Sequence, residues 1–143
     1  KNLRQGMVSI YLAQAIYFGR IEVKGSLNRF RDLIFIDDVV EIWWQIANNQ
    51  NIQNQVLNVG TGIKTTVSQL LKLIERFIPN SFHYTNNVTP GDQSGIYADI
   101  ERLQKISNYS TLTHIEDGLK KFLDYEMRKK NEDCCLDSST NGK

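Results

Sequence analysis

The sequence predicts an α/β fold, and three of its features lead to that prediction. Apolar residues at helical spacing alternate with short runs of β-branched and aromatic residues along the chain. Two patterns that begin at Thr66 and Thr113 have the form of a capping box, the signature of a helix start. Glycine, proline and asparagine separate the segments. The 143 residues suffice for one domain that buries about two-thirds of the surface of the unfolded chain.

The predicted helices follow from apolar spacing and from their end signals. Met7–Phe18 carries apolar residues at helical spacing and stops at Gly19, a residue that commonly ends helices. The capping boxes begin two later helices, and the basic residues around Lys130 suit the C-terminal dipole of the last one. The predicted helices are residues 7–18, 38–47, 67–78, 98–106 and 113 to about 130.

The predicted strands are short and rich in β-branched or aromatic residues. Residues 56–59 form the most strand-like tetrad, and Gly60 and Gly62 close it. The predicted strands are residues 21–23, 33–36, 56–59 and 82–84. Residues 1–130 are therefore expected to form the folded part, whereas residues 131–143 are too polar to pack and are expected to form a disordered tail.

Composition excludes several classes of partner. The 17 basic and 16 acidic residues give a net charge of +1, so no global field attracts nucleic acid or an acidic membrane. The longest apolar stretch is too short and too polar to span a bilayer. The adjacent Cys134 and Cys135 suit neither a disulfide framework nor a spaced pair of metal ligands, so a reducing, cytoplasmic setting is expected. Because the chain opens on KNLRQG without a methionine, we expect a piece of a longer protein.

Two local patterns have the spacing of dinucleotide-dependent enzymes without completing it. Gly60 and Gly62 follow a predicted strand, as in G-x-G-x-x-G, but Thr65 replaces the third glycine and no acidic residue follows about 20 residues on. A tight turn between a strand and a helix is the favoured interpretation. Tyr125 and Lys129 have the Tyr-x-x-x-Lys spacing, which places both on one helix face, but chance often supplies such a match.

Four segments together carry a resemblance to a known family: GMVSIYLAQA, VKGSLNRFRDLIFIDDVVE, LNVGTG and PGDQSGIYADIERLQKI. In this order and spacing, the chain resembles the C-terminal part of the NAD-dependent nucleotide-sugar epimerases and dehydratases of the extended short-chain dehydrogenase family. The likeness covers residues 3 to about 125. It implies the last strands of a Rossmann-type sheet beside a small α/β substrate-binding subdomain. The family's glycine-rich dinucleotide loop and catalytic Tyr-x-x-x-Lys belong to a first half without counterpart here.

The resemblance also implies a UDP-sugar pocket. Arg31 matches the arginine that binds the diphosphate, a role suited to a planar guanidinium that donates two parallel hydrogen bonds to phosphate oxygens. Lys24 stands where relatives often carry an aromatic residue, Thr89 where many carry a second arginine, and Ile96 where some carry a tyrosine. The predicted substrate-binding residues are Gln5, Met7, Val23, Lys24, Arg31, Thr89 and Ile96.

The charges around Arg31 leave other interpretations open. Arg29 is two residues away, so an extended backbone would direct both arginines to one face, but Arg29 matches no family role. Arg31 could instead pair with Asp32, Asp37 or Asp38. The last two could act as general acid and base, although capping and dipole chemistry at a helix start is the favoured interpretation.

The resemblance implies a parent enzyme that works by transient hydride transfer to NAD. This chain would bind the UDP-sugar, while the missing N-terminal half would bind NAD and carry the catalytic tyrosine and lysine. For the chain alone, we expect no catalysis, no bound cofactor and no metal. The parent could be a homodimer, and epimerisation, dehydration and reduction all stay open. The alternative is a non-catalytic remnant or interaction module that retains the fold.

Overall fold

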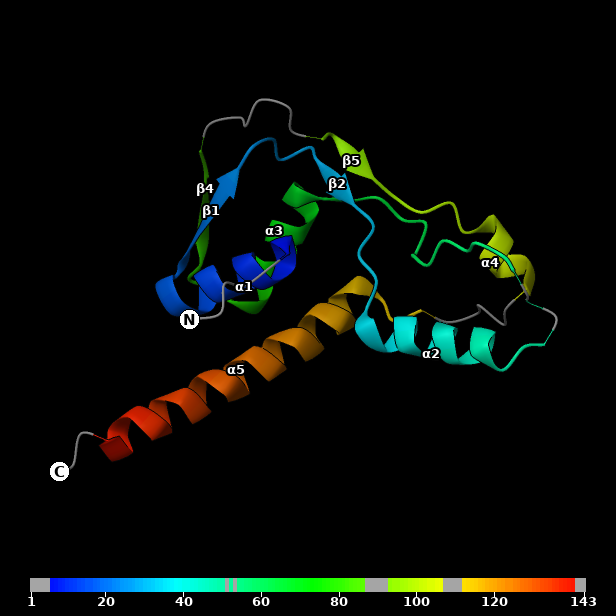
Figure 1. Ribbon diagram of the computed structural model, residues 1–143. Coiled ribbons are helices and arrows are strands. Elements are labelled where there is room, and N and C mark those ends of the chain that lie inside the picture. Colours follow the sequence, from blue (N-terminus) through cyan, green and yellow to red (C-terminus); the bar gives the residue numbers. More distant parts are fainter. Residues whose placement is uncertain (1–5, 51, 53, 87–92, 107–111, 141–143) are drawn as a thin grey trace.

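The computed structural model describes residues 6–50, 52, 54–86, 93–106 and 112–140, and it confirms the predicted α/β class. In Figure 1, α1, α3, β1 and β4 gather at one end of the molecule, and α2 and α4 lie at the other. The elements in chain order are α1 (Met7–Phe18), β1 (Arg20–Lys24), β2 (Phe30–Arg31), α2 (Ile36–Ala47), β3 (Thr65–Thr66), α3 (Val67–Phe77), β4 (Phe82–Asn86), β5 (Gly95–Ile96), α4 (Glu101–Ile106) and α5 (Ile115–Thr140).

The hydrophobic core lies where α1 and α3 pack against β1 and the start of α5. α1 ends as predicted at Gly19, whose φ of 63° is left-handed and suits glycine. α3 begins with the predicted capping box, in which the backbone nitrogen of Gln69 donates to Thr66 Oγ1 at 3.1 Å and the backbone nitrogen of Thr66 donates to Gln69 Oε1 at 2.8 Å. The buried core residues are Tyr11, Leu12, Ala15, Ile21, Val23, Val67, Leu70, Leu71, Ile74 and Leu119.

The strands form two small sheets. β1 and β4 pair in parallel, which confirms the strands predicted at residues 21–23 and 82–84. In the second sheet, β2 is central, antiparallel to β3 and parallel to β5. Its register places Arg31 opposite Thr65 on one side and opposite Ile96 on the other. Residues from three distant parts of the chain therefore meet around Arg31.

Two of the predicted strands are wrong. The strand expected at residues 33–36 lies earlier, at β2, and Ile36 already begins α2. The neighbours β3 and β5 contain two residues each, so the paired positions end at Arg31, and past it, among the described residues, only the backbone nitrogen of Asp32 donates to β5, to the carbonyl oxygen of Ile96 at 3.1 Å. Residues 56–59 form no strand, and their main chain makes no backbone–backbone hydrogen bond within the described part of the chain. Strand propensity reflects packing against neighbouring strands, and here no such neighbour is described.

The second predicted capping box is also wrong, and so is the predicted end of the last helix. Thr113 donates to the carboxylate of Asp38 from its hydroxyl (2.8 Å) and its backbone nitrogen (2.9 Å). Glu116 accepts from Arg76 at 2.9 Å, so neither residue forms the reciprocal bonds of a capping box. α5 continues past Lys130 to Thr140 because residues 131–140 contain no glycine or proline to break it. The separate tail at residues 131–143 stays a prediction.

Candidate functional site

Arg31 lies on β2, the central strand of the sheet formed by β3, β2 and β5. Side chains paired across neighbouring strands leave from the same face, so Arg31 shares a face with Thr65 and Ile96. The side chain is half-buried, and its Nη1 donates to the carbonyl oxygen of Phe30 at 2.7 Å. This bond uses one of the five donors of a guanidinium, so the group retains capacity for an anion.

The acidic residues near Arg31 do not pair with it. Within the described part of the chain, no ion pair joins Arg31 to Asp32, Asp37 or Asp38. The carboxylate of Asp38 accepts instead from Thr113, and this tie connects the start of α2 to the start of α5. Asp37 and Asp38 lie in the first turn of α2, where negative charge suits the helix dipole. The dipole interpretation of the acidic pair is therefore supported.

The carboxylate of Asp32 joins three segments that are distant in sequence. Thr61 donates to Oδ1 from its backbone nitrogen (2.8 Å) and its hydroxyl (2.5 Å). The backbone nitrogens of Gly62 (2.9 Å) and Ala98 (3.1 Å) donate to Oδ2. Asp32 directly follows Arg31, and Ala98 lies two residues after Ile96. The carboxylate therefore fixes the strand ends on both sides of the Arg31 face.

Glycine is required at both ends of the turn that Asp32 binds. A Cβ atom at Gly60 would lie 2.6 Å from the Cβ of Ala98 and 2.7 Å from Asp32 Oδ2. Gly62 has a φ of +72°, which L side chains rarely adopt. In a dinucleotide loop, N–H groups of this kind face a phosphate, whereas here they face an internal carboxylate. The geometry thus supports the tight-turn interpretation.

These hydrogen bonds also set the charge state of Asp32. Burial raises the pKa of its carboxyl group, but the bonds from Thr61, Ala98 and Gly62 stabilise the carboxylate and outweigh burial. The pKa therefore lies below the ordinary value of 3.8. At neutral pH, Asp32 is a charged group whose acceptor sites are already used by the fold. It is stable as an anion without Arg31 as its counter-charge.

The opposite face of the same sheet carries an aromatic cluster that the sequence analysis missed. Alternation along β2 directs Phe30 away from the Arg31 face. The rings of Phe30 and Tyr97 lie edge to face with centroids 6.2 Å apart, and Lys64 Nζ lies 5.1 Å and 4.4 Å from these centroids. A Cβ atom at Gly95 would lie 2.5 Å from the Phe30 ring, so glycine makes room for it. The cluster depends on the β pairing of residues 30 and 95, and no local sequence pattern predicts that pairing.

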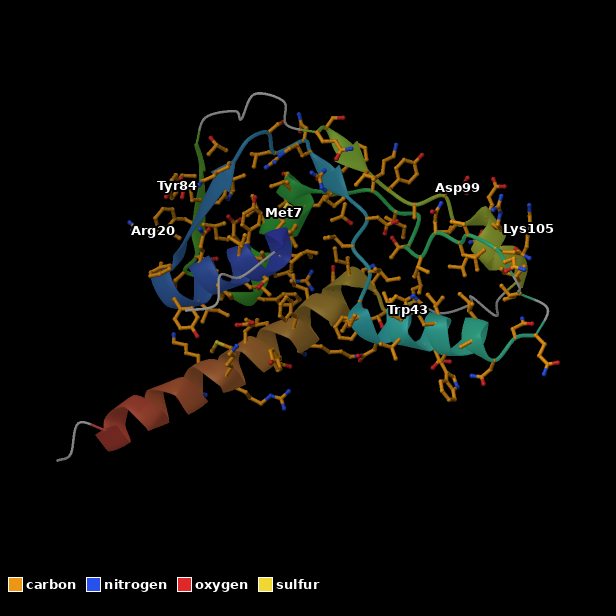
Figure 2. The ribbon with its side chains drawn as sticks, viewed as in Figure 1. Met7, Arg20, Trp43, Tyr84, Asp99 and Lys105 are labelled. Atoms are coloured by element: carbon orange, nitrogen blue, oxygen red, sulfur yellow. The ribbon has the colours of Figure 1, made fainter. Side chains whose placement is uncertain are left out.

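The structure brings together only some of the predicted pocket residues. Arg31 and Ile96 are paired neighbours, and the side chain of Ile96 is exposed. Figure 2 shows Met7 at the start of α1, where it packs against the core. The side chain of Val23 is fully buried in β1, and the carbonyl oxygen of Lys24 accepts from Arg29 Nη2. The predicted residues Gln5 and Thr89 lie outside the described residues.

A cavity of about 630 Å³ lies beside this site, between the segment that follows β2 and the start of α5. None of the predicted pocket residues that the structure describes lines it. Tyr125 lines the cavity but Lys129 does not, so the Tyr-x-x-x-Lys spacing does not form a joint site there. The lining residues are Val8, Asp32, Leu33, Ile34, Phe35, Ile36, Leu70, Thr113, His114, Ile115, Gly118, Leu119, Lys121, Phe122 and Tyr125.

Two other features are absent from the described residues. No group of three or more histidine, cysteine, aspartate or glutamate residues is placed to bind a metal ion in the described part of the chain. Among the same residues, no helix combines the length and the apolar character needed to cross a membrane.

The chain is similar in sequence and in fold to known nucleotide-sugar epimerases. No protein-family model matches the sequence. The UDP-glucuronate 4-epimerase of Thermodesulfobacterium geofontis is 26% identical over 107 residues, which are 73% of this chain and 32% of that protein. The solved structure of Thermotoga maritima UDP-glucose 4-epimerase with UDP-glucose matches at a TM-score of 0.78 and 26% identity, over 87% of this chain and 40% of that one. This chain matches the C-terminal part of a nucleotide-sugar epimerase or dehydratase.

A further epimerase shares the fold of this epimerase-like chain. The UDP-glucuronic acid 4-epimerase of Bacillus cereus, solved with UDP-glucuronic acid and NAD, matches at a TM-score of 0.75 and 21% identity, over 85% of this chain and 39% of that one. The chain spans 32 to 40% of the length of the curated relatives that it matches. The predicted resemblance to the C-terminal part of such enzymes, and the fold that it implied, are confirmed.

Proposed function

We propose that this chain is the substrate-binding part of an NAD-dependent nucleotide-sugar epimerase or dehydratase, and that Arg31 binds the diphosphate of a UDP-sugar. The supporting observation is the distribution of charge around Arg31. Asp32 is engaged by backbone donors, and Arg31 has no carboxylate partner among the described residues. A half-buried arginine without an internal anion suits an external one, and its planar fork fits two phosphate oxygens. The Thermotoga maritima relative was solved with UDP-glucose, which supports this class of substrate.

The remaining predicted residues complete the proposed pocket. Ile96 lines the proposed pocket beside Arg31. The carbonyl oxygen of Lys24 now accepts from Arg29 Nη2, and it would accept from the nucleobase instead when the ligand binds. The full protein would act in the cytoplasm, as a monomer or a homodimer, by epimerisation, dehydration or reduction. The residues that we assign to the pocket are Gln5, Met7, Val23, Lys24, Arg31, Thr89 and Ile96.

NAD belongs, in this proposal, to the N-terminal part of the protein. The described residues do not fit a dinucleotide, because the turn at residues 60–62 donates its N–H groups to Asp32 and not to a ligand. Lys129, which completes the Tyr-x-x-x-Lys spacing with Tyr125, does not line the cavity, and Lys121, which does, lies with its Nζ 5.0 Å from the centroid of the Phe35 ring. We therefore expect neither NAD binding nor turnover of UDP-glucose by this chain alone, as measured by calorimetry and by product analysis.

Calorimetric titration of UDP tests the role of Arg31 in the protein that joins this chain to its N-terminal part. Arg31→Ala should weaken binding by about 1.5 to 3 kcal/mol, which is the range for hydrogen bonds to a charged group. Arg31→Lys should recover part of the loss, because a point charge cannot reproduce the guanidinium fork. Arg20→Ala is the matched control, since Arg20 is an exposed arginine on β1 (Figure 2). Equal affinity for wild type and Arg31→Ala, at one fixed ionic strength, would refute the diphosphate role.

The alternative function is a non-catalytic module that retains the fold. The lack of a fit for NAD within the described residues favours it for the chain taken alone. The two functions differ in one measurement, which is turnover by the protein that contains both parts. UDP binding without NAD binding and without turnover in that protein would favour the module.

A further inference from the structure

The strands on both sides of Arg31 are too short to fix their own positions. β3 and β5 contain two residues each, whereas strands in proteins usually run about 3 to 10 residues. They present Thr65 and Ile96 to the face that Arg31 occupies. A ladder of this length fixes a segment weakly, because few hydrogen bonds offset the conformational entropy that each ordered residue loses. The geometry around Arg31 therefore needs support from outside the ladder.

Asp32 supplies this support on both sides of Arg31. Its carboxylate accepts from the backbone nitrogen of Gly62, three residues before Thr65. The same carboxylate accepts from the backbone nitrogen of Ala98, two residues after Ile96. The backbone nitrogen of Asp32 also donates to the carbonyl oxygen of Ile96 at 3.1 Å. One residue thus ties down both segments that contribute a neighbour of Arg31.

The acceptor sites of the Asp32 carboxylate are used by these internal donors. Thr61 donates twice, from its backbone nitrogen and its hydroxyl, and Gly62 and Ala98 donate once each, which makes four hydrogen bonds. A carboxylate has about four lone-pair sites. Side-chain alternation also directs Asp32 away from the face of Arg31. Any effect of Asp32 on a ligand of that face is therefore exerted through the position of Arg31.

We propose that Asp32 is a positioning residue for phosphate recognition, and that its carboxylate aligns the guanidinium of Arg31 with two phosphate oxygens. A planar fork donates two parallel hydrogen bonds only when it is aligned with both acceptors, so a small shift of β2 against its neighbours costs one of the two bonds. The close packing of the carboxylate supports this role. A Cβ atom at Gly60 would lie 2.7 Å from Asp32 Oδ2, so the carboxylate has little room to move.

The variant Asp32→Asn separates this role from two others by the sign of its effect on UDP affinity. A merely structural role leaves the affinity of the folded variant unchanged. A purely electrostatic role tightens binding, because the substitution removes a negative charge near a bound diphosphate. A positioning role weakens binding by about tenfold, which corresponds to the loss of one hydrogen bond to a charged group.

A double-mutant cycle tests whether Asp32 acts through Arg31. The measurement is calorimetric titration of UDP at neutral pH and fixed ionic strength, in the protein that joins this chain to its N-terminal part. Asp32→Asn should weaken binding by about tenfold when Arg31 is present and by less than about twofold in the Arg31→Ala background, where no fork remains to be aligned. Asp37→Asn, at an exposed carboxylate of α2, is the matched control and should change neither affinity.

The cycle also separates this inference from the diphosphate role of Arg31, on which it rests. If Arg31→Ala weakens UDP binding but Asp32→Asn leaves it unchanged, tightens it, or weakens it equally in both backgrounds, the positioning role is overturned and the diphosphate role stands. If Arg31→Ala itself leaves the affinity unchanged, the diphosphate role fails, and the positioning role fails with it.

A milder substitution decides the test if Asp32→Asn does not fold. Thr61→Val removes the hydroxyl that donates to Asp32 Oδ1 but keeps the backbone donors of the turn. It should weaken UDP binding by about threefold when Arg31 is present, because part of the support of the carboxylate is lost. Thr85→Val makes the same change at an exposed position of β4 and should have no effect. Equal affinity of Thr61→Val and wild type would then overturn the proposal.

Discussion

The two ends of the molecule differ in how far their apolar surfaces are covered. At the α1–α3 end, helices α1, α3 and the start of α5 enclose a core with β1 (Figure 1). At the other end, the buried apolar residues of α2 and α4 are Ile42 and Leu103, while Trp43 and Trp44 are exposed. The first end is stabilised by contacts within the chain. The second leaves large apolar side chains exposed, so a single chain combines a closed core with an open apolar surface.

The largest expected effect comes from one substitution made at each end. Ile74→Ala removes a fully buried side chain of α3 and should lower the free energy of unfolding by about 2 to 5 kcal/mol, because it leaves a cavity in a packed core. Ile36→Ala removes the same atoms from an exposed position of α2 and should change it by less than about 0.5 kcal/mol. Urea unfolding of this chain measures both. Similar losses at the two positions would contradict the contrast between the ends.

The next effect concerns Asp32, which joins the end of β2 to the turn at residues 61–62 and to Ala98. Asp32→Asn should lower the free energy of unfolding by about 1 to 3 kcal/mol, because an amide can accept with one oxygen only and leaves backbone donors of Thr61, Gly62 or Ala98 unpaired. Asp37→Asn is the matched control on the exposed first turn of α2. Urea unfolding measures both variants. A loss from Asp37→Asn as large as that from Asp32→Asn would mean that the hydrogen bonds of Asp32 do not stabilise the fold.

Acid should reproduce the Asp32 effect without a mutation. The pKa of Asp32 is depressed in the folded state, so its stabilisation is present above the unfolded value, near 3.8, and is lost as pH falls through the folded pKa. The difference in unfolding free energy between wild type and Asp32→Asn should therefore be constant near neutral pH and shrink below about pH 4. Urea unfolding at a series of pH values measures it. A difference that grows on acidification would show that the folded pKa is raised.

How much the sequence predicted depends on whether a feature is local. The capping box at Thr66 and the stop at Gly19 were predicted because each is complete within a few residues. The strand predicted at residues 56–59 is wrong, because a strand needs a pairing partner and the described residues provide none. The capping box predicted at Thr113 is wrong because the hydroxyl of Thr113 donates to a carboxylate that is distant in sequence, that of Asp38. Local signals therefore predict where helices begin and end. Long-range contacts determine whether a strand forms and whether a capping side chain bonds to a distant group instead.

In the candidate site, too, local features were predicted and long-range contacts were missed. Arg31 was identified from its motif, and its pairing with Ile96 agrees with the predicted pocket. The role of Asp32 was missed, because its donors lie 29 to 66 residues away and no local pattern reports them. The spacing of Gly60 and Gly62 was a partial signal, since it predicted a tight turn but not the carboxylate that the turn surrounds. Sequence reasoning therefore identified Arg31, whose binding role stays a proposal, and missed Asp32, whose hydrogen bonds connect the segments around it.

The smallest expected effect is at the ion pair between α3 and α5. Arg76 Nη2 lies 2.9 Å from Glu116 Oε2, and both side chains are substantially exposed. Exposed pairs contribute about 0 to 1 kcal/mol because water and salt screen them, whereas nearby Leu119 buries α5 against the core. Arg76→Gln should therefore lower the free energy of unfolding by less than about 1 kcal/mol, and about 1 M salt should remove most of that difference. Arg128→Gln, at an exposed arginine of α5, is the control in the same urea titrations. If Arg76→Gln costs as much as Ile74→Ala, then charge and not packing attaches α5, and the closed end of the molecule is less self-sufficient than its buried core indicates.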